Sequence, residues 1–304
     1  MWGGGHKIMK LRPAEILALL NLIAYGIIRL GADLHGFNWY GLEQAFGRLF
    51  YGFLPVILLL WAYVGYRLMR GKDHKVRVPW RDLVVLVVLF FSYWTLAGMA
   101  GGDRVDLIHM LSPIDRDDML MGADMALLGS HPSQALEAFA SKALTEFLLT
   151  IYLLAYLPLF IMLLFILHGR GYEKDRDVLV TAFTLAYTLA IPIFFLVPAT
   201  GPAFNLDFQS DLYVPCGVRA QDMELAIKGI DSTQRNCFPS LHVALSTIAL
   251  LMVGKLRRGE KAVFAALVLI LWFSTLYLRY HYFIDLLAGW SLAIFSVWAS
   301  KRLV

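Results

Sequence analysis

Residues 261–300 read KAVFAALVLILWFSTLYLRYHYFIDLLAGWSLAIFSVWAS, which is two apolar runs interrupted by Arg279, Tyr280 and His281. A helix that crosses a bilayer needs about 20 mostly apolar residues, and each run approaches that length. We therefore predict spanning helices at residues 262–278 and 282–299, joined by a tight hairpin. Six earlier runs have the same character, at residues 14–30, 51–69, 83–100, 144–168, 178–197 and 241–253. The sequence thus predicts an all-α polytopic membrane protein with about eight transmembrane helices.

The composition favours one membrane-embedded unit over two soluble domains. Of the 304 residues, 59% are hydrophobic and only 16% are charged, whereas soluble proteins average roughly 45–50% and 25%. The formal net charge is +4, but the basic residues form short tracts between apolar runs, as membrane topology signals do. We predict that the chain contacts the bilayer and binds no nucleic acid.

Lysine and arginine concentrate in alternate connections between the predicted spans. One set of connections holds Lys7, Lys10, Arg12, Arg67, Arg70, Lys72, Lys75, Arg77, Arg81, Arg170, Lys174, Arg176, Lys255, Arg257, Arg258, Lys261, Lys301 and Arg302. The rest of the chain holds only nine of the 27 basic residues. Because basic loops stay in the cytoplasm, both termini are predicted there, as an even number of spans also requires. We expect a protein of the plasma (inner) membrane.

Two long segments, residues 101–143 and 198–239, fall on the opposite, outward side. The first mixes aspartates with methionine and leucine, a mixture typical of helices that lie at a membrane interface. We predict one or two such helices. The aspartates are either solvated or bind a divalent cation. We favour solvation, and we predict no metal site and no cofactor.

The two cysteines of the chain, Cys216 and Cys237, both lie in the second outward segment. Disulfides persist in oxidising compartments, and the predicted topology places this segment in one. A Cys216–Cys237 bridge and two unlinked thiols are both open, because the cysteine count does not decide between them.

The stretch NCFPSLH, residues 236–242, opens the sixth predicted span. Proline is favoured in the first turn of a helix, and Ser240 suits the N-cap position. The free N–H groups and positive dipole end of a helix N-terminus favour phosphate. His242 is expected to project from this first turn.

His281 and Asp285 lie where the eighth predicted span opens, four residues apart and therefore expected on one helical face. A carboxylate beside an imidazole fixes its tautomer, and an aspartate inside a membrane helix is a functional residue by default. Both histidine-bearing helices run inward from the same outer face, so His242 and His281 are predicted at similar depth. A lone histidine is more often a packing or anchoring residue, but this coincidence favours one outward-facing catalytic site.

Pro239-Ser240-Leu241-His242 and His281-Tyr282-x-x-Asp285 resemble the second and third signature motifs of the type 2 phosphatidic acid phosphatase superfamily. The resemblance covers residues 83–299 and implies that family's six-helix core. It therefore divides the chain into a two-helix N-terminal extension, residues 1–82, and a core at residues 83–304 with the two outward segments.

The chain departs from the phosphatase pattern in two places. The Lys-x6-Arg-Pro motif of that branch has no match, and the Ser-Arg pair that opens the third motif reads Ser274-Thr275. This reduced set, together with Val197-Pro198-x-x-Gly201-Pro202, is similar to the inositol phosphorylceramide synthase branch. Sphingomyelin synthases share the reduced set. Such relatives transfer a phosphorylated head group between lipids.

The resemblance implies a metal-independent, two-step transfer. His281, oriented by Asp285, attacks phosphorus and forms a phosphohistidine. His242 protonates the departing alkoxide and then deprotonates the acceptor hydroxyl. The implied partners are a phospholipid donor, with phosphoinositol as the head group suggested by the branch, and a lipid alcohol acceptor.

Negative charge on the transferred group needs donors already in place. The candidates for phosphate or substrate binding are Ser240, Arg279, Arg235, Arg219 and Glu146. Tyr152 is a further candidate for lining the cavity, with packing as its alternative role.

Two other functions fit the same residues. A lipid phosphate or polyprenyl diphosphate phosphatase would use water as the acceptor in the second step. A non-catalytic lipid transporter or scaffold would use them as a relay or a lipid-binding site, and it predicts that His281→Ala spares activity. The oligomeric state is left open.

Overall fold

The fold is taken from a computed structural model that describes residues 11–34, 79–96, 112–212 and 235–304. Within these residues the chain is helical, and its one pairing of extended backbone is an isolated bridge between Ala199 and Asn236. The helices are α1 (Pro13–Leu34), α4 (Trp80–Leu96), α6 (Asp117–Leu128), α7 (Pro132–Ala135), η1 (Leu136–Phe139), α8 (Lys142–Gly169), α9 (Glu173–Leu196), α10 (Pro202–Asn205), α12 (Leu241–Met252), η2 (Val253–Lys255), α13 (Arg258–Tyr277) and α14 (Phe283–Leu303).

Seven of the eight predicted spans fall on helices, six of them long and one, at residues 241–253, short. The remaining span, residues 51–69, lies outside the described residues. Three helices, α9, α13 and α14, are long and apolar enough to cross a membrane. A fourth, α8, qualifies if its two halves, which meet at a bend of 46°, form one span. The prediction of an all-helical membrane fold is therefore confirmed, whereas the number eight stays a prediction.

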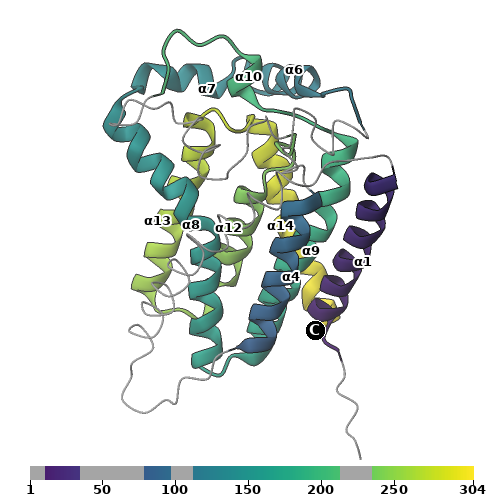
Figure 1. The fold of residues 1–304 in the computed structure, drawn as a ribbon. Coiled ribbons are helices and arrows are strands. Elements are labelled where there is room, and N and C mark those ends of the chain that lie inside the picture. The colour runs from purple at the N-terminus through teal and green to yellow at the C-terminus, as the bar shows by residue number, and fades with distance from the viewer. Residues whose placement is uncertain (1–10, 35–78, 97–111, 213–234) are drawn as a thin grey trace, which may run out of the picture.

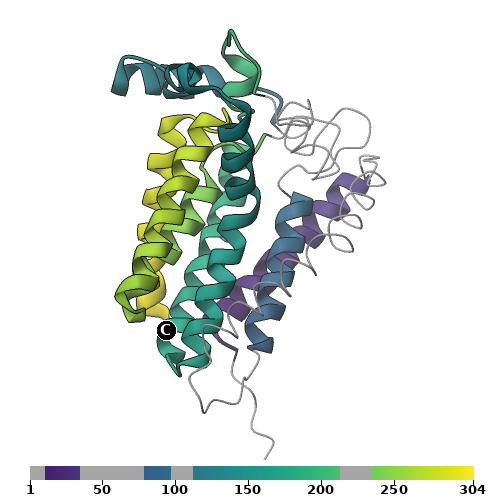
Figure 2. The same cartoon turned by 90° about the vertical axis from the view of Figure 1, so that its left-hand side faces the viewer.

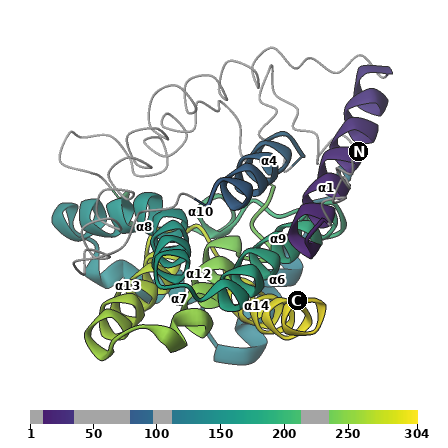
Figure 3. The ribbon, with the colours of Figure 1, turned by 90° about the horizontal axis from the view of Figure 1, so that it is seen from below.

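The short helix α12 lies at the centre of the bundle, in contact with α8, α9, α13 and α14 (Figure 3). Nine of its 12 residues are buried. A helix that is apolar on all sides is typically buried on all sides by its neighbours. Ser240 is its N-cap, as predicted, with the Ser240 Oγ accepting from the Val243 N–H at 3.4 Å. The predicted tight hairpin is also present, since α13 ends at Tyr277 and α14 begins at Phe283.

Helix α14 approaches the start of α12 closely because residue 289 is glycine. A Cβ at Gly289 would lie 2.7 Å from the Ser240 carbonyl oxygen and 3.1 Å from the Val243 Cβ. Both obstacles belong to the first turn of α12, where a flexible side chain is not available to move aside. The glycine thus sets the spacing between the two helices that carry the histidine motifs.

We expect Gly289→Ala to destabilise the protein by about 1–3 kcal/mol, the usual cost of overpacking, and to lower any activity that needs both motifs. The measurement is thermal unfolding of the purified protein in detergent. Gly26→Ala is the matched control, because Gly26 lies in α1 with nothing within 4 Å of the added Cβ. Equal melting temperatures for the two variants would contradict the close approach.

Helices α6, α7 and η1 lie across one end of the long helices (Figure 1 and Figure 2). They fall within the outward segment 101–143, where one or two interfacial helices were predicted. Residues 101–111 of that segment are outside the described part of the chain. Helices α12 and α14 both begin at the end covered by α6, so their N-terminal turns meet beneath it.

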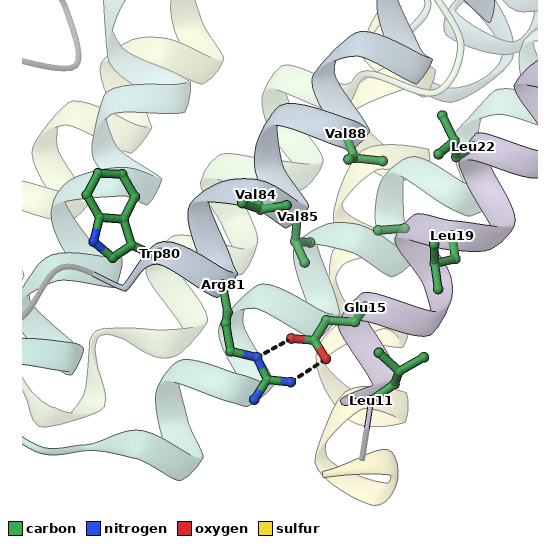
Figure 4. A pocket seen from close by; sticks show the side chains of 10 residues that line it. Leu11, Glu15, Leu19, Leu22, Trp80, Arg81, Val84, Val85 and Val88 are labelled. Carbon is green, nitrogen blue, oxygen red and sulfur yellow. Dashed lines mark hydrogen bonds and ion pairs between the residues drawn. The ribbon is translucent and has the colours of Figure 1, made fainter. Parts of the chain in front are cut away.

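Charged side chains tie α1, α4 and α9 together at the opposite end of the bundle. Arg12 pairs with Asp82 at 2.7 Å and with Asp177 at 2.9 Å, joining the starts of three helices. Glu15 and Arg81 pair at 2.6 Å at the mouth of an apolar groove between α1 and α4 (Figure 4). This end of the bundle carries the basic connections that the sequence predicts to be cytoplasmic.

Candidate active site

The two predicted catalytic histidines lie close together, although 38 residues separate them in the sequence. His242 is the second residue of α12, and His281 lies in the link between α13 and α14. Their ring centroids are 6.2 Å apart. A phosphoryl group between the two rings would therefore be within reach of both.

Asp285 contacts His281, but by a different route from the one predicted. His281 is not helical, because α14 begins at Phe283 and Tyr282 is its N-cap. The Asp285 side chain folds back over the start of the helix, where its Oδ2 accepts from the Tyr282 N–H at 2.8 Å and lies 3.3 Å from His281 Nδ1. This contact places Nδ1 against the carboxylate, so that Nε2 points away from it.

Cys237 lies in the same cluster as His281 and Asp285. Its Sγ is 2.9 Å from Asp285 Oδ2, 3.5 Å from His281 Nδ1 and 3.2 Å from the Tyr280 carbonyl oxygen. Burial, and then the negative charge of Asp285, raise the pKa of this thiol well above its usual range. Cys237 is a free thiol turned into the site, and the possible Cys216–Cys237 disulfide stays untested. Cys216 is outside the described residues.

Tyr152 of α8 holds the other histidine. Its ring stacks on His242 with centroids 4.1 Å apart and an angle of 24° between the planes. The same ring contacts Tyr280 at 4.6 Å. Tyr152 is 3% exposed, so this stack fixes the His242 ring from the side of α8.

Ser240 joins the start of α12 to α14. Its N–H donates to the Asp285 carbonyl oxygen at 3.2 Å, and its Oγ caps α12. Ser240 is fully buried. The structure therefore gives Ser240 a positioning role, and its part in phosphate binding stays a prediction.

Arg279 is a buried cation two residues from His281. Its φ of 66° is left-handed, and this turn sends the side chain toward η1 and the segment after α10. The Arg279 Nη2 lies 3.4 Å from Glu137 Oε1, and the guanidinium covers the Phe208 ring at 3.7 Å. Stacked and paired in this way, the cation is only 4% exposed.

The other predicted phosphate-binding residues have different surroundings. Arg235, two residues before Cys237 in the sequence, pairs with Asp115 at 2.8 Å. Glu146 is exposed on α8, about 120° around the helix from Tyr152 at 100° per residue. Arg219 lies outside the described residues.

Two aspartates of α6, Asp117 and Asp124, accept hydrogen bonds from the backbone around the site. Both were predicted to be solvated. Asp117 accepts from the Thr200 and Gly201 N–H groups at 3.0 and 2.9 Å, and from the Tyr282 hydroxyl at 2.8 Å. Asp124 accepts from the first two N–H groups of α14 at 2.9 and 2.8 Å. Their spacing of seven residues, two helical turns on one face, is the signal that was available.

The Val197–Pro202 motif lies against the His281 link through its glycine. Gly201 has a φ of 97°, and a Cβ there would be 2.7 Å from the Tyr280 carbonyl oxygen. Its N–H is held by Asp117. The motif therefore serves close backbone packing beside the catalytic link, a role that only glycine fills at this φ.

We expect Asp124→Asn to lower the melting temperature, because an anionic cap on a helix N-terminus contributes about 0.5–2 kcal/mol. Turnover is expected to fall by more than the loss of folded protein explains, since Asp124 fixes the turn that carries His281 and Asp285. Melting temperature and turnover measured side by side test this. Asp118→Asn is the control, on the same helix but exposed, and an equal loss in both variants would count against the cap.

Comparison with known families gives a name to this arrangement. A sequence profile of the PAP2 superfamily matches residues 119–299. The chain belongs to the PAP2 superfamily. The match runs from α6 to α14, so the PAP2 region includes the helix that bears Asp124 and both histidine motifs. It leaves α1 and α4 outside, whereas the sequence analysis extended the resemblance back to residue 83.

Members of the PAP2 superfamily are phosphatases or phosphotransferases, which makes this chain an enzyme candidate of that class. Together with its helices long enough to span a bilayer, PAP2 membership identifies an integral membrane protein. Searches of curated proteins and of solved structures found no match. The inositol phosphorylceramide synthase-like branch therefore stays a prediction.

Proposed function

We propose that this protein is a membrane-embedded lipid phosphotransferase, which moves a phosphorylated head group from a phospholipid donor to a lipid alcohol acceptor. The observation that carries the proposal is the pairing of His242 and His281 across 6.2 Å, with Asp285 buried against Nδ1 of the second ring. This arrangement provides a nucleophile, a group that orients it and a separate proton carrier.

In the first step, the His281 Nε2 lone pair attacks phosphorus, and the bond from phosphorus to the lipid alkoxide breaks. His242 donates its proton to that alkoxide, leaving a diacylglycerol-like alcohol and a phosphohistidine. In the second step, His242 takes the proton of the acceptor hydroxyl, the new P–O bond forms and the P–N bond breaks. Asp285 holds the Nδ1 proton throughout, which stabilises the positive charge that develops on the ring.

Arg279 is the best candidate for stabilising the phosphoryl oxygens. It is buried and two residues from His281, and Glu137 and Phe208 hold it in place. A preorganised cation in a site that excludes water acts more strongly than one in solvent. Arg235 and Arg219 are kept as secondary candidates for the approach of the head group.

The uncharged pair Ser274-Thr275 of α13 supports transfer of the head group over release of phosphate. Where the phosphatase pattern has arginine, Thr275 donates its hydroxyl to the Trp272 carbonyl, and the preceding Ser274 donates to the Leu271 carbonyl. Both side chains are fully buried. A site with one cation fewer has a weaker hold on free phosphate, which favours passing the group directly to a second lipid.

The shortness of α12 supports a lipid substrate. Its 12 residues extend about 18 Å at 1.5 Å per residue, against a hydrocarbon thickness of about 30 Å. If η2 ends at the cytoplasmic surface, His242 lies below the opposite surface, within reach of a lipid head group and its acyl chains. This position agrees with about eight spans, both termini in the cytoplasm and an outward-facing site.

The experiment uses purified protein in vesicles that contain a phospholipid with a labelled head group, with and without ceramide or diacylglycerol. The proposal expects label on the added acceptor, at a rate that rises with acceptor concentration. A soluble, labelled, phosphorylated head group released without an acceptor shows that water is the acceptor and supports the hydrolase alternative instead. Absence of both products from the unmodified protein, with lipid binding that His281→Ala leaves intact, supports the non-catalytic transporter or scaffold.

A further inference from the structure

A thiol, an imidazole and a carboxylate lie close together on the Nδ1 side of the proposed nucleophile, His281. Cys237 Sγ, His281 Nδ1 and Asp285 Oδ2 form a triangle with sides of 3.5, 3.3 and 2.9 Å. All three residues are buried, and these ligand atoms lie within 4.8 Å of one another. The proposed transfer gives Cys237 no role, so its presence in the cluster calls for an explanation.

The triangle has nearly the size of one face of a zinc tetrahedron. Zn–S bonds of about 2.3 Å and Zn–N or Zn–O bonds of about 2.0–2.1 Å at tetrahedral angles place the ligand atoms roughly 3.4–3.6 Å apart. The two sides that include His281 Nδ1, 3.5 and 3.3 Å, already agree with this spacing. The side from Cys237 Sγ to Asp285 Oδ2, at 2.9 Å, would have to open by about 0.6 Å.

The second oxygen of Asp285 gives an independent indication. Oδ1 is buried and has no hydrogen-bond partner within the described part of the chain, and Asp285 is fully buried. A buried carboxylate oxygen without a donor is costly. A divalent cation in the cluster would neutralise this carboxylate.

We propose that Cys237, His281 and Asp285 form a zinc-binding site that switches the catalytic histidine off. Zinc replaces the Sγ proton of Cys237, which passes to solvent, and it takes the place of the proton on His281 Nδ1. A neutral imidazole that binds a metal through one nitrogen carries its proton on the other, so the displaced proton is bound at Nε2. The nitrogen that attacks phosphorus then has no lone pair to offer.

Zinc binding rests on the geometry of the cluster alone, whereas the inhibition also rests on the proposed function. The two are therefore tested separately. Site occupancy is measured on the purified, metal-free protein in detergent, by titration of Zn²⁺ against a chromophoric chelator. Co²⁺ serves as a second probe, because a cobalt–thiolate bond produces a charge-transfer absorption band that carboxylate and imidazole ligands do not.

The proposal expects one tightly bound Zn²⁺ per chain and a thiolate band with Co²⁺. Cys237→Ser retains a hydroxyl to donate to Asp285, and we expect it to weaken zinc binding at least about 10-fold and to remove the band. Cys216→Ser is the matched control and is expected to bind as the unmodified chain does. The chain has eight histidines, which could bind zinc elsewhere, so occupancy alone does not identify the site. Zinc bound equally by Cys237→Ser, or the absence of a thiolate band from the unmodified protein, overturns the proposed site.

Inhibition is read as the ratio of turnover with and without Zn²⁺ within each variant, so that a change in basal activity does not enter. We expect zinc to lower turnover at least about 10-fold in the unmodified chain and in Cys216→Ser, with recovery on adding a chelator. A ratio near one in Cys237→Ser is the companion result. Zinc that binds the unmodified chain without slowing it overturns the switch, and a chain that binds zinc but has no turnover at all contradicts the proposed function alone.

Discussion

Replacing His281 by alanine is expected to reduce transfer of the labelled head group by more than about 10⁴-fold, as loss of a nucleophile does in other covalent mechanisms. The reason is that the variant loses the ring nitrogen that forms the bond to phosphorus, on the histidine whose Nδ1 lies 3.3 Å from the buried Asp285 carboxylate. Binding of the donor lipid is expected to change little, because the lost interaction is made mainly in the transition state. Turnover and lipid binding measured on the same vesicles separate the two effects.

Asp285→Asn is the companion variant for the same prediction. Asparagine retains the shape of the side chain but has no negative charge for the Nδ1 proton, so a large loss of turnover with intact folding is expected. Rapid quenching under alkaline conditions, which preserve phosphohistidine, should detect a labelled intermediate in the unmodified protein and none in His281→Ala. A labelled intermediate that survives in His281→Ala would assign the nucleophile to another residue.

Replacing His242 by alanine is expected to reduce turnover of a natural phospholipid by about 10²–10⁴-fold, the usual contribution of general acid–base catalysis. The variant should behave differently with a donor whose leaving group is a nitrophenol. Nitrophenolate leaves without being protonated, so the first step no longer needs His242. The second step still needs a base, so we expect one equivalent of nitrophenol in a burst and then very slow release.

The burst is measured by absorbance after rapid mixing, and its amplitude is compared with the amount of protein. His131→Ala is a suitable control, because His131 lies at the start of α7, at the same end of the molecule, outside the histidine pair. We expect it to turn over normally with both donors. A His242→Ala variant that turns over the nitrophenyl donor continuously would show that His242 is not the base of the second step.

Much of the fold follows from local sequence, because hydrophobic length and helix caps act over a few residues. The predicted spans at residues 144–168, 178–197 and 262–278 coincide with α8, α9 and α13, since long apolar runs have few other stable conformations in a bilayer. Ser240 was predicted as an N-cap and is one. The nearness of His242 and His281 also followed from the sequence, through the count of spans and their direction.

The contacts between distant segments did not follow from it. Asp117 and Asp124 look like solvated residues until α6 lies across α14, where Asp124 receives the first N–H groups of that helix. The sequence left Cys237 open between a loop disulfide and an unlinked thiol, and only tertiary packing turns its Sγ to Asp285 at 2.9 Å. Arg279 was predicted only as a candidate for phosphate binding, and the structure alone shows that a left-handed φ of 66° directs its side chain to Glu137.

The sequence by itself therefore determined that the chain is helical and membrane-embedded, and it predicted which three residues carry the chemistry. Those conclusions rest on residue type, run length and short spacings, which need no knowledge of the partners. The tertiary structure alone decided how His281 and Asp285 meet ahead of the helix and which thiol joins them. Such contacts depend on backbone turns and on helices more than 150 residues apart, such as α6 and α14 with Asp124 and Phe283, and no local pattern encodes them.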